Sequence, residues 1–238
     1  MSDPHPLEEE VYDMSGARLA LTLCVTKARE GSEEDLDALE YMFQQLKFES
    51  IMKRDPTAEQ FQEELEKFQQ AIDTWEGPVS CAFVALMAHG EEGLLEGEDG
   101  KMVKLENLFE VLNNKNCQAL RAKPKVYIIQ ACRGEQKDPG ETVGEDEMVM
   151  ITQTIPTYTD ILHIYSTVEG HISYRHEQNG SCFIQTLVDV LTNRKGPILE
   201  LLTEVTRRMA EAELVQGGKV RKVNPEIQST LRKRLYLQ

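Results

Sequence analysis

A cysteine and a histidine each follow closely on an apolar segment of this chain. Cys132 comes two residues after the strand-like run 125–130, and His89 comes directly after the apolar run 81–88. A free thiol has a pKa of about 8.5 and is mostly protonated at neutral pH. An adjacent imidazole can stabilise the thiolate and later protonate a leaving amine. The pair therefore predicts nucleophilic catalysis, with Cys132 as the nucleophile and His89 as its acid–base partner.

Backbone groups beside these side chains could complete such a site. Gly90 has no side chain, so its N–H can approach a substrate oxyanion closely, and the N–H of Cys132 would be the second donor of an oxyanion hole. A buried core cysteine and an ordinary loop histidine are the alternative interpretation, which we would prefer for either residue alone. The occurrence of both, each after an apolar run, favours a catalytic pair.

The elements that must position this pair follow an alternating pattern. Amphipathic helices are predicted after Ser32 and Thr57, because each begins a capping-box signal, Ser32 with Asp35 and Thr57 with Gln60. Strand-like runs before, between and after these helices are typical of an α/β domain with a mostly parallel sheet. Neighbouring parallel strands would present His89 and Cys132 on the same edge of the sheet. The predicted strands of this part are 17–26, 48–52, 81–88 and 125–130, and a short helix over 105–112 precedes the last of them.

The second part of the chain begins after a segment that breaks the pattern. Residues 134–156 are rich in glycine, proline and acidic side chains, which predicts an exposed loop open to proteolysis. A strand over 160–167, helices over 181–193 and 198–214, and a final strand over 230–237 follow. We therefore divide the chain into a short N-terminal segment, a large part, a cleavable loop and a small part. Their ranges are 1–16, 17–133, 134–156 and 157–238.

Composition narrows the class of protein. The net charge of −15 makes nucleic acid an unsuitable partner, and no apolar run is long enough for a membrane span. The five cysteines have no closely spaced pair, which argues against a disulfide framework and against a metal site. No glycine-rich phosphate loop is present, and we expect no cofactor. The N-terminus has no signal-peptide pattern, so we expect a cytoplasmic location, with the nucleus as a further compartment.

Three motifs resemble those of the caspases, and the likeness covers nearly the whole chain. Gln130-Ala131-Cys132-Arg133-Gly134 matches the cysteine loop of that family, and a histidine stands 43 residues upstream at His89. The segment that follows His89, Gly90-Glu91-Glu92-Gly93, is similar to the family's histidine loop, and Ser173-Tyr174-Arg175 to its Ser-aromatic-Arg segment. The resemblance implies a caspase-like α/β fold and a cysteine endopeptidase that is made as a zymogen and cuts proteins after aspartate. It also implies a role in terminal differentiation or cell-death-type proteolysis.

The same resemblance assigns substrate-binding residues. Two arginines and a glutamine of the family clamp the substrate aspartate, and these correspond to Arg29, Arg175 and Gln130. Guanidinium groups suit this role because their forked donors bind carboxylates bidentately. Ser173 and Tyr174 would line the neighbouring pocket, where Tyr174 replaces the tryptophan of many relatives.

Activation is also implied by the resemblance. Asp146 is the most family-like processing point within 134–156, although that loop lacks an Asp-x-x-Asp motif. The neighbouring segment 148–151 is the alternative target, for a protease of another kind. We expect a homodimer of processed large and small subunits, with the sheet of about six strands continued across the dimer through the strand predicted at 230–237. The alternative is a catalytically weak or inactive caspase-like protein that dimerises or binds partners. Loss of the cysteine, the histidine or a clamp arginine would favour that alternative, and none of them is lost.

Overall fold

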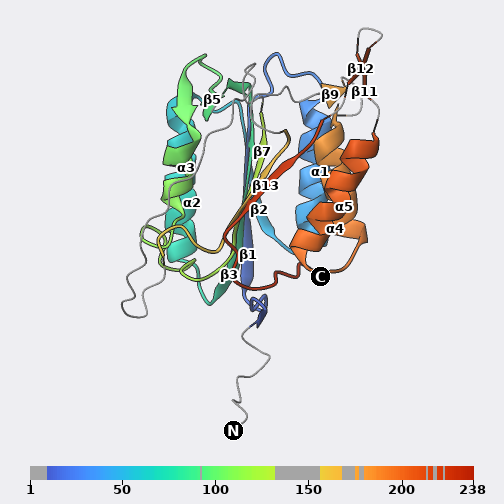
Figure 1. Cartoon of the computed structure of the whole chain (residues 1–238). Helices are drawn as coiled ribbons and strands as arrows, with labels where there is room; N and C mark the ends of the chain where they lie inside the picture. Colours follow the sequence, from blue (N-terminus) through green and yellow to red (C-terminus); the bar gives the residue numbers. More distant parts are fainter. Residues whose placement is uncertain are drawn as a thin grey trace, which may run out of the picture.

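A single mixed sheet lies between two layers of helices in the computed structural model (Figure 1). The sheet contains six strands, of which five are parallel, and this confirms the predicted α/β class with a mostly parallel sheet. The structure describes residues 10–91, 93–131, 156–167, 175–176, 180–212, 214–216, 219–221 and 223–238.

The order of the strands brings the two parts of the chain together. Four strands come from the large part and two from the small part, and the last strand, β13, runs antiparallel to β8. From one edge to the other, the strands are β13 (Glu226–Ser229), β8 (Ile161–Tyr165), β7 (Lys125–Gln130), β3 (Val79–Met87), β1 (Ala17–Cys24) and β2 (Glu49–Arg54). The central position of β3 and β7 explains their uninterrupted apolar sequences, because strands covered on both faces bury every side chain.

Helices cover both faces of the sheet. One face is covered by α1 (Ser32–Gln45), α4 (Cys182–Asn193) and α5 (Ile198–Glu211), and the other by α2 (Ala58–Asp73) and α3 (Leu105–Val111) (Figure 1). Alternate residues of β3 supply the two cores. Phe83 packs with the α1 side and Val84 with the α2 side, as the two-residue period of a strand requires.

Short additional strands lie near the end of the sheet at which the parallel strands terminate. A three-stranded sheet follows β3, and a two-residue ladder precedes α4. These strands are β4 (Gly90–Glu91), β5 (Leu94–Glu96) and β6 (Met102–Lys104), then β9 (Arg175–His176) and β10 (Gly180–Ser181). A further hairpin after α5 consists of β11 (Leu214–Gln216) and β12 (Lys219–Arg221).

The two predicted capping boxes had different outcomes. At Thr57 the box is confirmed, since the Thr57 side chain accepts from the Gln60 N–H and the Gln60 side chain accepts from the Thr57 N–H. At Ser32 the prediction was wrong, because Gly31 is the N-cap and no side chain caps this end. Asp35 is fully buried and accepts a hydrogen bond from the Ser181 N–H at 2.7 Å, so its carboxylate serves another element.

The predicted final strand over 230–237 was also wrong. The edge strand of the sheet is β13, which ends at Ser229, and the tail beyond it forms only isolated bridges, such as that between Tyr236 and Pro197. Leu235 and Leu237 are almost fully buried in the core on the α1 side. The alternating leucines therefore reflect a tail that packs into the core, a pattern that sequence periodicity cannot distinguish from a half-buried strand.

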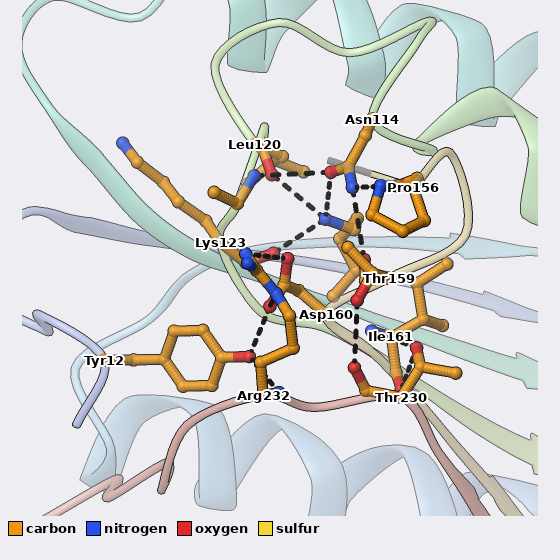
Figure 2. A network of polar contacts seen from close by, with 12 residues as sticks. Tyr12, Asn114, Leu120, Lys123, Pro156, Thr159, Asp160, Ile161, Thr230 and Arg232 are labelled. Carbon is orange, nitrogen blue, oxygen red and sulfur yellow. Dashed lines mark hydrogen bonds and ion pairs between the residues drawn. The ribbon is translucent and has the colours of Figure 1, made fainter. Parts of the chain in front are cut away.

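A buried polar network joins distant segments where β7 and β8 begin (Figure 2). Asp160, fully buried, accepts from the Tyr12 hydroxyl at 2.6 Å and from two nitrogens of Arg232 at 3.0 and 2.9 Å. Close by, the Lys125 ammonium donates to the Asn114 side chain at 2.9 Å and to two backbone carbonyls. Burial lowers the pKa of Lys125 to about 8, against the attraction of Asp160. The network fixes the start of the small part against the large part.

Candidate active site

The register of β3 and β7 aligns the two segments that lead to the predicted catalytic pair. Met87 is the partner of Gln130, and the next N–H, of Ala88, donates to the Gln130 carbonyl at 3.3 Å. His89 follows Met87 by two residues, and Cys132 follows Gln130 by the same number. Cys132 itself lies outside the described residues, of which Ala131 is the last in this segment. The two predicted residues thus follow equivalent positions of adjacent parallel strands.

The imidazole of His89 is exposed and oriented by a backbone group. Its Nε2 lies 3.2 Å from the carbonyl oxygen of Ala28, in the turn after β1. A carbonyl oxygen only accepts hydrogen bonds, so Nε2 must carry the proton. The neutral ring then has its unprotonated nitrogen at Nδ1. This tautomer is the one in which Nδ1 can accept a proton from a thiol.

Arg29 is buried beside the same strand ends, with an exposed fraction of 4%. Its Nη1 donates to the Val25 carbonyl at 2.8 Å, and its Nη2 lies 3.5 Å from the Gln130 carbonyl. Gln130 is equally buried, at 2%. A buried guanidinium requires such acceptors, since an uncompensated charge in the interior is very costly. The structure therefore brings Arg29 and Gln130 together at the carboxyl ends of β1 and β7.

The remaining predicted site residues are described only in part. Gly90 begins β4, directly after His89, and pairs with Leu95. Arg175 belongs to β9, where its backbone pairs with Ser181 of β10. Cys132, Ser173, Tyr174 and the processing residue Asp146 lie outside the described residues. Their predicted roles, and those of Gly90 and Arg175, stay predictions.

Sequence reasoning missed the role of Asp35. Its carboxylate receives the Ser181 N–H and, at 3.3 Å, the Gln185 side chain, so it ties α1 to the ladder that contains Arg175. Gly180 has φ of +76°, and a Cβ there would lie 2.4 Å from the Asp35 carboxylate, so the approach requires glycine. One signal was available. Asp35 is a charged residue on the otherwise apolar face formed by Leu36, Leu39 and Phe43.

Two other cysteines are unsuited to nucleophilic chemistry. Burial raises the pKa of the Cys81 thiol to about 12, and burial together with the nearby Asp73 carboxylate does the same for Cys117. Both thiols are fully buried, as is Cys24 in β1. The burial of these three cysteines agrees with a structural role.

One cavity lies beside His89 near the strand ends, and another lies at the β13 edge of the sheet. A cavity of about 380 Å³ beside His89 is lined by Lys27, Ala28 and the turn 96–100. A larger cavity of about 910 Å³ lies against β8 and β13, with Phe109, His163 and Tyr165 in its wall. Within the described ranges, no group of three or more acidic, histidine or cysteine side chains could hold a metal ion. In the same ranges no helix has the length and apolar character needed to cross a membrane.

A family model and several curated proteins that are similar to this chain all belong to the caspases. The model of the caspase domain matches residues 17–236. Caspase-14 of Homo sapiens is 84% identical over the full length of both chains, and Caspase-14 of Mus musculus is 70% identical over all of this chain and 98% of that protein. Caspase-3 of Bos taurus is 33% identical over 96% of this chain and 88% of its own length.

Proposed function

We propose a proteolytic function on one premise: this chain belongs to the caspase family. It is therefore a caspase-type cysteine peptidase, and proteins are its substrates. The observation that carries the chemistry is the pairing of Met87 with Gln130, which aligns the segments leading to His89 and Cys132. In this proposal Cys132 attacks the scissile carbonyl, and His89 takes its proton and later returns it to the leaving amine. The N–H groups of Gly90 and Cys132 stabilise the oxyanion.

The peptidase cuts after aspartate in this proposal. Arg29 supports it, because a cation buried at 4% exposure beside Gln130 has already lost its hydration and can bind a carboxylate strongly. Arg175 supplies the second guanidinium, and Asp35 holds the ladder that includes it against α1. Ser173 and Tyr174 shape the adjoining subsite.

The protein is made as a zymogen in this proposal, and an activating protease cuts the 134–156 loop at Asp146. The contacts that flank the loop support such processing. Asn114 donates through its backbone N–H to the Thr157 carbonyl at 3.1 Å. Its side chain donates to the Pro156 carbonyl at 2.9 Å (Figure 2). The small part would therefore stay bound after a cut upstream of residue 156. By family membership, the enzyme acts in terminal differentiation or cell-death-type proteolysis, in the cytoplasm and also in the nucleus.

Two processed chains pair across β13 in this proposal. Among the described residues this strand is the last in the strand order, and an edge strand can pair with a strand of another chain. The 910 Å³ cavity beside it, which includes Gln228 and Ser229, leaves room for side chains from a second copy. An antiparallel pairing of β13 with its own copy would obey two-fold symmetry and extend the sheet.

A peptide series tests the proposed specificity. Processed protein is given four peptides that differ only in having aspartate, glutamate, asparagine or alanine at the cleaved position. We expect turnover of the aspartyl peptide to exceed that of the asparaginyl peptide at least 10-fold, because asparagine cannot form the charge-assisted pair with Arg29. Equal turnover of the two would show that no carboxylate clamp exists. Failure of all four peptides with a folded dimer would favour a catalytically inactive interaction protein.

A further inference from the structure

Two residues other than glycine adopt left-handed backbone conformations just after the carboxyl ends of the neighbouring strands β1 and β2. Ala28, in the turn after β1, has φ of +54°, and Asp55, after β2, has φ of +52°. The two strands are neighbours, and Cys24 pairs with Arg54 at their ends. Such conformations cost free energy, and they are often retained at functional sites, where surrounding contacts stabilise them.

The Asp55 side chain binds the turn that contains Ala28. Its Oδ1 accepts from the Thr26 N–H at 2.7 Å and from the Lys27 N–H at 3.3 Å, and the Thr26 hydroxyl lies 3.0 Å from both carboxylate oxygens. The Asp55 N–H donates to the Cys24 carbonyl at 2.7 Å, so the residue is itself fixed to β1. Partial burial opposes ionisation, but the hydrogen bonds from Thr26 and Lys27 hold the pKa of Asp55 below its usual range.

The turn held by Asp55 bears two groups of the candidate active site. Ala28 supplies the carbonyl oxygen that accepts from Nε2 of His89 at 3.2 Å. Arg29 follows directly, and its N–H closes the turn on the Thr26 carbonyl at 3.0 Å. A shift of the turn would therefore displace two groups together. One is the Ala28 carbonyl that accepts from the imidazole, and the other is the backbone of Arg29, to which the guanidinium side chain is attached.

We propose that Asp55 is a positioning residue that holds the 26–29 turn, and through it orients the His89 imidazole and the Arg29 guanidinium. This inference rests on the proposed function of Cys132 and His89. The carboxylate touches neither substrate nor reacting atoms and acts only through the turn. Because a displacement of about 1 Å at a catalytic group can lower a rate by about 100-fold, the fixed turn matters for turnover.

Two substitutions distinguish a positioning role of the Asp55 carboxylate from a role of Asp55 in the backbone conformation alone. Asp55→Gly accepts the left-handed backbone without strain but removes the carboxylate. Asp55→Asn also tolerates that conformation and keeps one acceptor oxygen for the Thr26 N–H. If the residue matters only for the backbone conformation, glycine is harmless. If the carboxylate positions the turn, glycine is the more damaging change, and asparagine preserves part of the function.

Asp73→Asn is a matched control. Asp73 ends α2 and likewise organises a loop, since its carboxylate accepts from the Ala119 N–H at 2.9 Å. That loop contains no residue assigned to the site. Thr26→Val and Thr26→Ser form a second pair, since valine removes the hydroxyl that donates to Asp55 and serine restores it.

The test combines two readouts on the processed protein. The first is the pH profile of iodoacetamide alkylation at Cys132, followed by mass spectrometry of its peptide, with His89→Ala as reference. The second is kcat/KM on an aspartyl peptide. For Asp55→Gly we expect a profile shifted toward that of His89→Ala and a 10- to 100-fold loss in kcat/KM. Asp55→Asn and Thr26→Val should lose less, whereas Thr26→Ser and Asp73→Asn should match the parent.

The outcomes separate the two claims. If His89→Ala alters the profile but folded Asp55→Gly and Thr26→Val keep the parent's profile and kinetics within twofold, Asp55 has no positioning role. If His89→Ala itself leaves the alkylation profile unchanged, the catalytic pair is absent and both claims fall. Should Asp55→Gly fail to fold, the alkylation profiles and kcat/KM values of Thr26→Val, Thr26→Ser and Asp55→Asn decide whether Asp55 has a positioning role, with the same twofold limit.

Discussion

At the scale of single residues, the protonation of His89 connects the geometry to the chemistry. The Ala28 carbonyl keeps the proton on Nε2 and leaves Nδ1 to receive the proton of a thiol. When the imidazole becomes positively charged, the same carbonyl stabilises it, since a charged donor makes a stronger hydrogen bond. In the proposed mechanism, His89 can therefore act first as a base and then as an acid without changing its orientation.

The first prediction concerns the pair itself. Cys132→Ala should abolish peptide hydrolysis, and His89→Ala should be nearly as severe, because the members of a nucleophile–base pair fail as a unit. Both variants should unfold at close to the parent's temperature, since His89 is exposed and packs little. Steady-state kinetics and thermal unfolding check this. Hydrolysis by Cys132→Ala at a tenth of the parent's rate would contradict it.

The second prediction concerns Arg29. Arg29→Lys should lower kcat/KM for an aspartyl peptide roughly 10- to 150-fold, the effect of losing a charge-assisted bond of about 1.5–3 kcal/mol. Arg18→Lys is the control, since Arg18 lies near the other end of β1 and also donates to backbone carbonyls, of Leu46 and Leu237. It should affect stability but leave kinetics unchanged. Equal kinetic losses in both variants would exclude a specific clamp at Arg29.

At the scale of elements, β8 contains a histidine in an aromatic environment. The ring centre of His163 lies 4.2 Å from the ring centre of Phe109 and 5.3 Å from the ring centre of Tyr127. Its Nε2 is buried without a hydrogen-bond partner among the described residues. Burial lowers the pKa of His163 to about 4. The folded protein therefore keeps this ring neutral in a range where the unfolded chain binds a proton.

The third prediction follows from this shift. As the pH falls from 6.5 toward 4, the unfolded state gains a proton at His163 that the folded state does not, so the free energy of unfolding decreases. The full effect is at most about 3 kcal/mol, and partial exposure reduces it. His163→Phe should lose less stability than the parent over this range, measured by denaturant unfolding at several pH values. Parallel pH dependence of the two proteins would contradict the assignment.

The elements also show how far sequence reasoning reaches. The strand 125–130 was predicted with its observed limits, and the Thr57 helix start was confirmed, because apolar runs and capping residues are local signals. The strand at 230–237 was wrong, because Leu235 and Leu237 bury the same surface in an irregular tail as they would in a strand. The contacts of Asp35 with Ser181, 146 residues away, depend on tertiary structure and no local pattern predicts them.

The candidate site was predictable to a similar extent. His89 and Cys132 could be chosen because each follows an apolar strand, and the register of β3 with β7 agrees with that choice. Arg29 was indistinguishable from a surface residue without the family resemblance, since its burial depends on the turn and on β7. Asp55 carried no signal beyond that of a turn residue before Pro56.

At the scale of the whole molecule, the network around Asp160 and the candidate active site lie at opposite ends of the parallel strands. The network joins Tyr12, Asn114 and Arg232 where β7 and β8 begin (Figure 2), whereas His89 follows the opposite, carboxyl end of β3. A cut in the 134–156 loop would therefore leave the sheet assembled. In the proposed activation, the site can then rearrange without separation of the two parts.

The fourth prediction concerns pairing across β13. Gln228→Lys should weaken the dimer, because two-fold symmetry brings like charges on the two β13 strands close to each other. Gln44→Lys makes the same charge change on an exposed position of α1 and should have no effect. Sedimentation and activity measured across one dilution series, before and after loop cleavage, test this. Identical dissociation of the two variants would place the interface elsewhere, and full turnover by uncut monomer would refute the proposed activation.

The most direct test of the central claim is covalent labelling by an aspartyl peptide that bears a thiol-reactive group. The label is located by mass spectrometry in intact and loop-cleaved protein, with Cys182→Ala as a control because Cys182 is a partly exposed cysteine. We expect labelling of Cys132 that is faster after cleavage than before, faster than with the asparaginyl analogue, and lost in His89→Ala. Labelling that falls on Cys182, or that proceeds equally without His89, would contradict the central claim.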